Sequence, residues 1–243
     1  MPTRLYFPNV TNTSIGAAPA AQWTIRSGAA GPGIAVRTKT AVAAGVVAVA
    51  SSGGGVEEFI IQKRFLTEAL PAQILGGTIK GVIKGIQNNA ALNATYAIGI
   101  RVLSNDASTL KQVALNPVAP LPTAVPPELH TSTRPRVFRD SSGNTDITLG
   151  SVPIEENDRL EISFGYRNDA SSGYTVTTIF QDDVGVDLDH ADGIETNQNA
   201  DLWVEFSQDI INPDEPNPPI EQGDSWNGLS ALSGLTGGGN IGE

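Results

Sequence analysis

The chain has 243 residues, of which 40% are hydrophobic, enough to build one sizeable core. Its formal net charge of −11 offers no basic surface to phosphates, which excludes nucleic acid as the main ligand and disfavours an anionic membrane. Only 17% of the residues are charged, and so neutral a surface suits large contacts with other proteins.

The first residues carry no targeting signal that we recognise. They lack the apolar core of a signal peptide, and the nearest approach to a membrane span, residues 41–50, is far too short to cross a bilayer. The chain also contains no cysteine, so nothing points to an oxidising compartment. We therefore expect synthesis in the cytoplasm.

Residues 1–33 mix small residues, prolines and glycines around two short extended segments, 5–7 and 23–26. This composition predicts an N-terminal arm or edge segment. Phe7 and Trp23 are the side chains in it that are large enough to anchor a protein interaction.

The segment from Glu58 to Asp106 organises the rest of the chain. Between residues 75 and 85, apolar residues and glycines share one face at a period of two, and residues 92–103 alternate in the same way after a polar turn. The pattern predicts two long strands joined as a hairpin. A lone hairpin is unstable in water, so its apolar face must lie on another sheet.

After a short extended segment, 109–115, the stretch 116–127 contains five prolines, which cannot form a regular ladder. It predicts a surface crossing between two sheets, as in Greek-key and jelly-roll folds. A linker between two domains is the alternative.

Residues 160–166 alternate cleanly, and residues 174–180 are predicted to pair with them as a second hairpin. Residues 202–206 give the last strand, and no segment of ten or more residues has a helical period. The predicted fold is therefore all-β, a two-layer antiparallel sandwich of jelly-roll or Greek-key type, over residues 34–211.

From residue 212 to 243 the chain is rich in proline and glycine, which predicts an extended C-terminal arm. Such an arm becomes ordered when something holds it, most simply a neighbouring subunit, although packing on its own domain is the alternative. The predicted interaction anchors are its large apolar residues, Ile220, Trp226, Leu229, Leu232 and Leu235.

The acidic loop 182–195 is the best candidate for chemistry, because clustered carboxylates can hold calcium. Its weak candidate ligands are Asp187, Asp189 and Asp192. The spacing fails the EF-hand pattern, and His190 and His130 without cysteine do not suggest zinc. A solvated acidic loop is the favoured interpretation, so we predict no metal and no cofactor.

No enzyme motif is visible. The nucleophile elbow Gly-x-Ser-x-Gly and the phosphate-binding glycine loops are both absent from the sequence. Glu155 and Glu156 offer a carboxylate pair of the kind that glycosidases use, but any acidic β protein contains such pairs. Aromatic residues make up only 6% of the chain, which weakens a sugar-binding platform, although Trp203 lies on the strand face opposite Leu202 and Val204, where it would be exposed. We predict no catalytic residue.

Six segments of the chain together resemble β-sandwich virion proteins of tailed bacteriophages. They are residues 64–65, 79–81, 88–94, 100–106, 158–167 and 202–207, within a matched region of about 58–207. The resemblance implies a non-catalytic particle component, made in the host cytoplasm and present in many copies.

The resemblance implies in particular a capsid decoration or cement protein, located in the virion, that bridges and stabilises neighbouring subunits. Its expected partners are the major capsid protein or other virion proteins, and further copies of itself, with a trimer favoured. The alternative is a tail, baseplate or fibre component whose sandwich binds glycans on the host surface.

Overall fold

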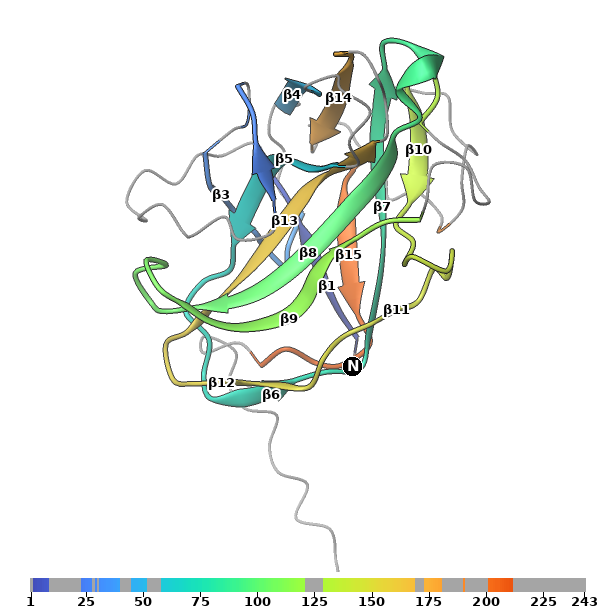
Figure 1. Ribbon diagram of the computed structural model, residues 1–243. Coiled ribbons are helices and arrows are strands. Elements are labelled where there is room, and N and C mark those ends of the chain that lie inside the picture. The colour runs from blue at the N-terminus through green and yellow to red at the C-terminus, as the bar shows by residue number, and fades with distance from the viewer. Residues whose placement is uncertain are drawn as a thin grey trace, which may run out of the picture. The chain divides into compact units, whose positions relative to one another are not determined.

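A computed structural model describes residues 2–8, 23–27, 29, 31–39, 45–51, 58–120, 129–168, 173–180, 190 and 201–211 (Figure 1). The chain divides into a compact unit, residues 1–212, and the remaining residues 213–243. Within the described part, no helix is long and apolar enough to span a membrane.

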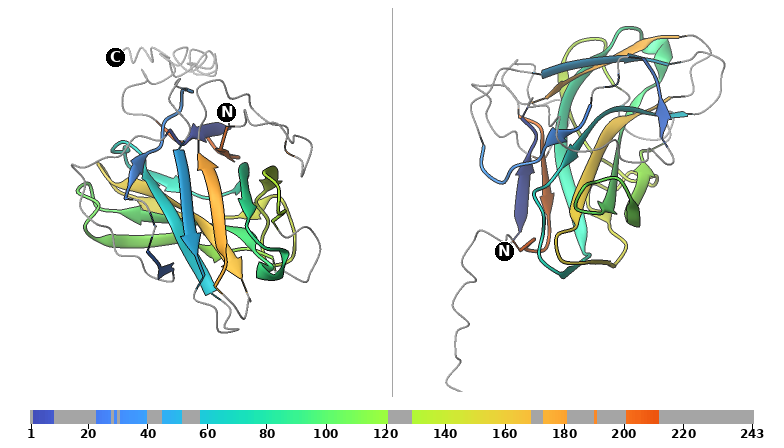
Figure 2. Two further views of the ribbon diagram at one scale, coloured as in Figure 1. Left: turned by 90° about the horizontal axis from the view of Figure 1, so that it is seen from above. Right: turned by 90° about the vertical axis from the view of Figure 1, so that its left-hand side faces the viewer.

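The compact unit is a sandwich of two main sheets (Figure 2). In the seven-stranded sheet, β15 and β14 pair with successive parts of one side of β7, β1 continues the sheet beyond β15, and β4 continues it beyond β14. β10 and β11 pair with the other side of β7. Its strands are β1 (Thr3–Tyr6), β4 (Gly45–Ala50), β7 (Thr78–Gln87), β10 (Arg134–Val137), β11 (Ile147–Thr148), β14 (Thr175–Phe180) and β15 (Trp203–Phe206).

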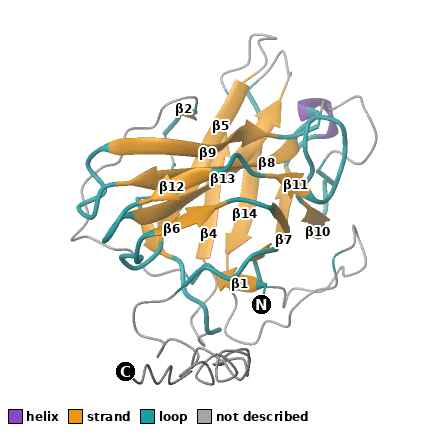
Figure 3. Ribbon diagram, turned by 90° about the horizontal axis from the view of Figure 1, so that it is seen from below, coloured by secondary structure: helices purple, strands orange, loops and turns teal. Residues whose placement is uncertain are grey.

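The six-stranded sheet has the order β2-β5-β13-β8-β9, with β3 also on β5. Its strands are β2 (Thr24–Ile25), β3 (Gly33–Ile34), β5 (Glu58–Leu66), β8 (Thr95–Leu103), β9 (Leu110–Val118) and β13 (Arg159–Asn168). A small separate ribbon pairs β6 (Gln73–Leu75) with β12 (Val152–Ile154), and the one described helical turn is η1 (Ala90–Leu92), purple in Figure 3.

These sheets confirm the predicted all-β, two-layer antiparallel class. All pairings between the named strands are antiparallel except those of β2 and β3 with β5. The jelly-roll or Greek-key connectivity stays a prediction.

Phenylalanine rings fill the centre of the sandwich. Phe164 of β13 lies between Phe65 of β5, in its own sheet, and Phe180 of β14, in the opposite sheet, with ring centroids 5.8 and 6.3 Å away. Phe7 and Phe138 approach the same ring to 4.7 and 5.6 Å. The aromatic core therefore joins the two layers, as expected for sheets that bury one face each.

Both predicted hairpins are wrong. β7 lies in the seven-stranded sheet and β8 in the six-stranded sheet, where β8 pairs with β13 and β9. The connection between them crosses from one layer to the other through η1, which Asn89 caps and Asn93 ends with a left-handed φ of 49°. β13 and β14 are likewise in opposite sheets. Alternation reports which side chains are buried, and it is the same for a hairpin and for a crossing between layers.

The proline-rich crossing begins later than predicted. β9 continues through Asn116 and Pro117 to Val118, although its register against β8 shifts at three places. β9 is the edge of its sheet, where a proline removes no ladder hydrogen bond if its nitrogen faces outward. Residues 121–128 lie outside the described residues.

The first strand is part of the sandwich and not a free arm. β1 pairs along its whole length with β15, from Thr3 opposite Phe206 to Tyr6 opposite Trp203. Tyr6 also exchanges backbone hydrogen bonds with Val36, at 2.7 and 2.9 Å. Of the two predicted alternatives for this segment, an arm or an edge segment, residues 3–6 take the second, held by a partner from the far end of the chain.

Candidate interaction surface

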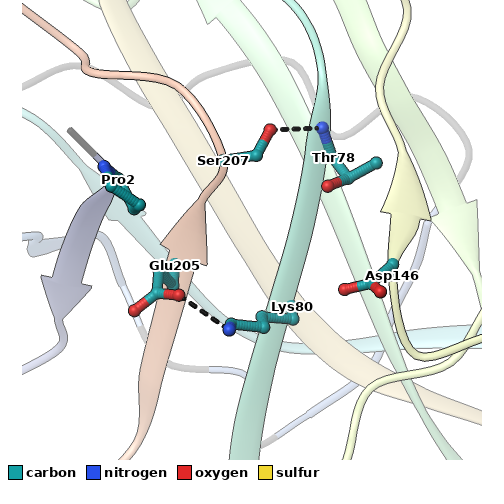
Figure 4. Close-up of a pocket in the computed structure, with 6 residues that line it drawn as sticks. All are labelled: Pro2, Thr78, Lys80, Asp146, Glu205 and Ser207. Atoms are coloured by element: carbon teal, nitrogen blue, oxygen red, sulfur yellow. Dashed lines mark hydrogen bonds and ion pairs between the residues drawn. The ribbon is translucent and has the colours of Figure 1, made fainter.

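A small depression of about 170 Å³ lies on the outer face of the seven-stranded sheet, lined by Pro2, Thr78, Lys80, Asp146, Glu205 and Ser207 (Figure 4). The Lys80 ammonium lies 2.9 Å from the Glu205 carboxylate, and Arg4 donates to the same carboxylate at 2.8 Å. Ser207 accepts from the Thr78 amide at 2.8 Å. The polar groups at this depression mostly bind one another.

The Glu205 carboxylate is held in its ionised form. Burial opposes its ionisation, but hydrogen bonds and charge from Lys80 and Arg4 together bring its pKa below the ordinary value of 4.5. A carboxylate with a lowered pKa and two bound cations is a poor proton donor near neutral pH. The ion pairs of Glu205 with Arg4 and Lys80 connect β15 to β1 and to β7.

Trp203 is not exposed, so the exposure predicted from its strand face is wrong. Only 1% of its surface is accessible. The Arg4 guanidinium lies 4.1 Å above its ring, and Tyr6, Val82 and Val137 pack around it. An outward-facing residue in a strand is still buried when neighbouring strands carry long side chains that cover it.

The carboxylates considered for glycoside hydrolysis stabilise a turn. Lys111 lies 2.6 Å from Glu155 and 2.7 Å from Asp158, and hydrogen bonds to these two carboxylates raise its pKa. Asp158 also accepts from the Glu155 amide, and Glu156 accepts from the Ala72 amide. Each group therefore has a structural partner at the start of β13.

Phe7 and Trp23, predicted to anchor another protein, are buried within this chain. Phe7 is in the aromatic core, with no accessible surface. Trp23 lies over the outer face of the six-stranded sheet, where a Cβ atom on Gly165 would come within 2.7 Å of its ring and one on Gly99 within 3.4 Å. The glycines leave room for the indole ring, so the interaction role predicted for both residues is wrong.

The other predicted site residues, Asp187, Asp189, Asp192, Ile220, Trp226, Leu229, Leu232 and Leu235, lie outside the described residues. From the acidic loop only His190 is described, and its ring lies 6.1 Å from that of Trp203. Among the residues that the structure does describe, no group of three or more His, Asp or Glu is placed to bind a metal ion.

Sequence reasoning missed a polar cluster inside the sandwich. Opposite β13 the register of β5 shifts by one residue, so that Gln62 is an extra residue beside Lys63. Gln62 donates to the Val176 carbonyl at 3.0 Å and accepts from the Thr178 hydroxyl at 2.6 Å. A β-bulge aims two successive side chains to one side, which strict alternation does not anticipate.

Only 2% of the Lys63 surface is accessible to solvent. Its ammonium lies 4.9 and 5.3 Å from the ring centres of Phe65 and Phe180. Burial lowers its pKa from 10.5 to about 8. The folded state therefore releases this proton at a lower pH than the unfolded state does.

We expect the free energy of unfolding to rise between pH 8 and 10, because the unfolded chain then binds the Lys63 proton that the folded chain has lost. Lys63→Met should remove this rise, whereas Lys111→Met, at an exposed lysine, should keep it. Urea unfolding at several pH values measures the effect. An equal rise in wild type and Lys63→Met would show that another group is responsible.

Few large apolar side chains are exposed among the described residues: Ile25, Val46, Ile74 and Ile211. Gln73, next to Ile74, donates a hydrogen bond to the Ile211 carbonyl, and Pro153, also exposed, lies opposite Ile74 in register. Ile74 and Pro153 form what we call the end patch. Val46 lies on β4, an edge strand.

The chain was compared with known proteins. No family model matches it, and no curated protein matches it. Two solved structures of a CocE/NonD family hydrolase from Staphylococcus aureus are similar at TM-scores of 0.28 and 0.25, with 9% and 10% identity, over 85% of this chain. The chain spans about a third of that hydrolase, 34% of its length. Scores this low carry no argument about fold or function.

Proposed function

We propose that the protein is a non-enzymatic structural subunit of a tailed-phage particle, of the kind that sits on the capsid and bridges neighbouring subunits as a decoration or cement protein. Its partners on this proposal are the major capsid protein or other virion proteins, together with copies of itself. It would be made in the host cytoplasm and end in the virion.

One observation carries the proposal. Most of the segments that resemble phage virion proteins are neighbours in space: five of the six fall on β5, β13 and β8, which are consecutive in one sheet, or on β7 and β15, which are adjacent in the other. The sixth, residues 88–94, contains η1 in the connection from β7 to β8. The resemblance therefore follows a continuous part of the framework on both layers.

The ion pairs of the described carboxylates agree with a structural role. The carboxylates of Glu155, Asp158 and Glu205 each bind lysine or arginine of a neighbouring strand or turn. The end patch adds exposed apolar surface, and Ile211, which is also exposed, directly precedes residues 212–243. Contact surface and a following proline-rich segment are what a bridging subunit needs.

Removing residues 213–243 should weaken attachment to particles by about tenfold or more, because burying even one large apolar anchor is worth ~1.5–3 kcal/mol. The unfolding transition of residues 1–212, which form the compact unit, should be unchanged. Co-sedimentation of purified protein with particles measures attachment. A variant in which the 31 residues 213–243 are scrambled in order is the control for length and charge. Equal attachment of the truncated and full chains would contradict the proposal.

The alternative is a tail, baseplate or fibre component that binds host glycans. Trp203, the aromatic residue expected to be exposed to a sugar, is buried, so it does not support this alternative. A glycan array probed with the purified protein tests it, and glycan binding without attachment to capsids would favour it over the leading proposal.

A further inference from the structure

The open edges of the sandwich differ in how they are protected. Edge strands expose unpaired backbone groups, and proteins commonly block them with charge, proline, bulges or short length. β9 has Lys111, Pro117 and three register shifts. β2 and β3 have two residues each, and β1 has four residues that include Arg4.

β4 has none of these protections. It has six residues, Gly-Val-Val-Ala-Val-Ala, without charge or proline, and its register against β14 is unbroken. It lies outermost in its sheet, beside β14 in Figure 1, and no described strand pairs with its other side. The neighbouring β14, Thr-Val-Thr-Thr-Ile-Phe, is also uncharged.

The register shows which residues of β4 face the open edge. The Ser51 amide donates to the Tyr174 carbonyl at 2.8 Å, so residue 51 is in a hydrogen-bonded pair with β14. Backbone groups alternate between the two edges of a strand. Residues 45, 47 and 49 therefore face β14, while Val46, Ala48 and Ala50 face outward. The side chains of these same three residues are exposed, that of Val46 to 63%.

We propose that β4 pairs antiparallel with β4 of a second copy of this chain, about a two-fold axis at Ala48. Val46 then lies opposite Ala50 of the other copy, and Ala48 lies opposite itself. Each of these pairs exchanges two backbone hydrogen bonds. The two seven-stranded sheets become one continuous sheet.

A second copy is the occupant that fits this edge best, because the edge is both uncharged and self-complementary. Each chain has a formal net charge of −11, so two copies repel each other over most of their surfaces. The uncharged strip of β4 and β14 lets them approach without placing like charges opposite one another. The outward residues are also self-complementary, since small apolar side chains meet small apolar side chains across the axis.

This pairing is independent of the phage assignment and predicts a dimer, whereas the sequence favoured a trimer. In sedimentation experiments the wild type should dimerise. Ala48→Pro should raise the dissociation constant of the dimer roughly 30-fold, because it removes two hydrogen bonds on the axis, each worth about a factor of five. Ala48→Lys, which keeps the amide, should also dissociate the dimer by placing two ammonium groups face to face.

Thr177→Lys is the matched control. Thr177 lies opposite Ala48 on β14, one strand further from the axis, so a lysine there should leave the dimer intact. Because the chain has no cysteine, Ala48→Cys should give a cross-linked dimer with a short thiol-reactive linker, and Thr177→Cys should not. A monomeric wild type overturns the inference. It does so even if the monomer uses β4 to bind a particle protein. So does a dimer that survives both Ala48 variants. Loss of particle attachment with an intact dimer counts against the proposed function alone.

Discussion

Phe164→Ala is expected to lower the free energy of unfolding by about 3–5 kcal/mol. The side chain has no accessible surface. Its ring contacts those of Phe7, Phe65, Phe138 and Phe180, with centroid distances from 4.7 to 6.3 Å. Alanine leaves a cavity where the two layers meet and removes aromatic pairs worth about 0.5–1.5 kcal/mol each beyond their burial.

Urea unfolding at one fixed protein concentration measures this loss, because self-association would make the stability depend on concentration. Ile74→Ala is the control, since Ile74 is 68% exposed and its truncation should change the stability by no more than about 0.5 kcal/mol. A loss below about 1 kcal/mol for Phe164→Ala would show that the aromatic core does not join the layers as described.

Glu161→Ala should cost about 3–5 kcal/mol for a different reason. Glu161 is 1% exposed on the outer face of the six-stranded sheet. Its Oε1 atom accepts from the Arg101 guanidinium and from the Ser163 hydroxyl, the latter at 2.6 Å, and its Oε2 atom lies 3.6 Å from Arg64. Alanine removes the carboxylate that balances the Arg101 charge in a buried site.

The double variant Glu161→Leu, Arg101→Met separates charge from packing. Replacing both members of a buried ion pair with apolar residues is often neutral or stabilising, so the double variant should recover most of the lost stability. Denaturant unfolding of the two variants makes the comparison. If the double variant is no more stable than Glu161→Ala, the loss is one of packing, and the electrostatic explanation fails.

Much of the strand content could be predicted from alternation in the sequence. The predicted strand at 160–166 is observed as β13 (Arg159–Asn168), and the one at 92–103 is observed as β8 (Thr95–Leu103). Each strand shows alternation because one of its faces lies on the aromatic core. Alternation does not show in which of the two sheets a strand lies. The crossings from β7 to β8 and from β13 to β14 were therefore predicted as hairpins.

Local sequence patterns could not predict which distant strands pair or which side chains cover one another. β1 finds its partner in β15, near the other end of the described chain, and nothing local in residues 3–6 specifies that pairing. Trp203 is covered by Arg4 from β1 for the same reason. The place of β4 at an unprotected edge depends on the order of strands in the sheet.

The interaction sites were predicted from the size of side chains alone. Phe7 and Trp23 are large and lie in proline- and glycine-rich sequence, which suggested anchors on another protein. Phe7 instead fills the core, and Trp23 fills the space above Gly99 and Gly165. The surface that the structure leaves open, β4, consists of small residues that no size criterion would select.

The most direct test of the account is an image of phage particles labelled with an antibody against the purified protein. If the protein is a structural subunit that reinforces the capsid, the label should decorate heads at many regularly spaced positions. Particles that carry no label, in a lysate where the protein is abundant and free, would contradict the account.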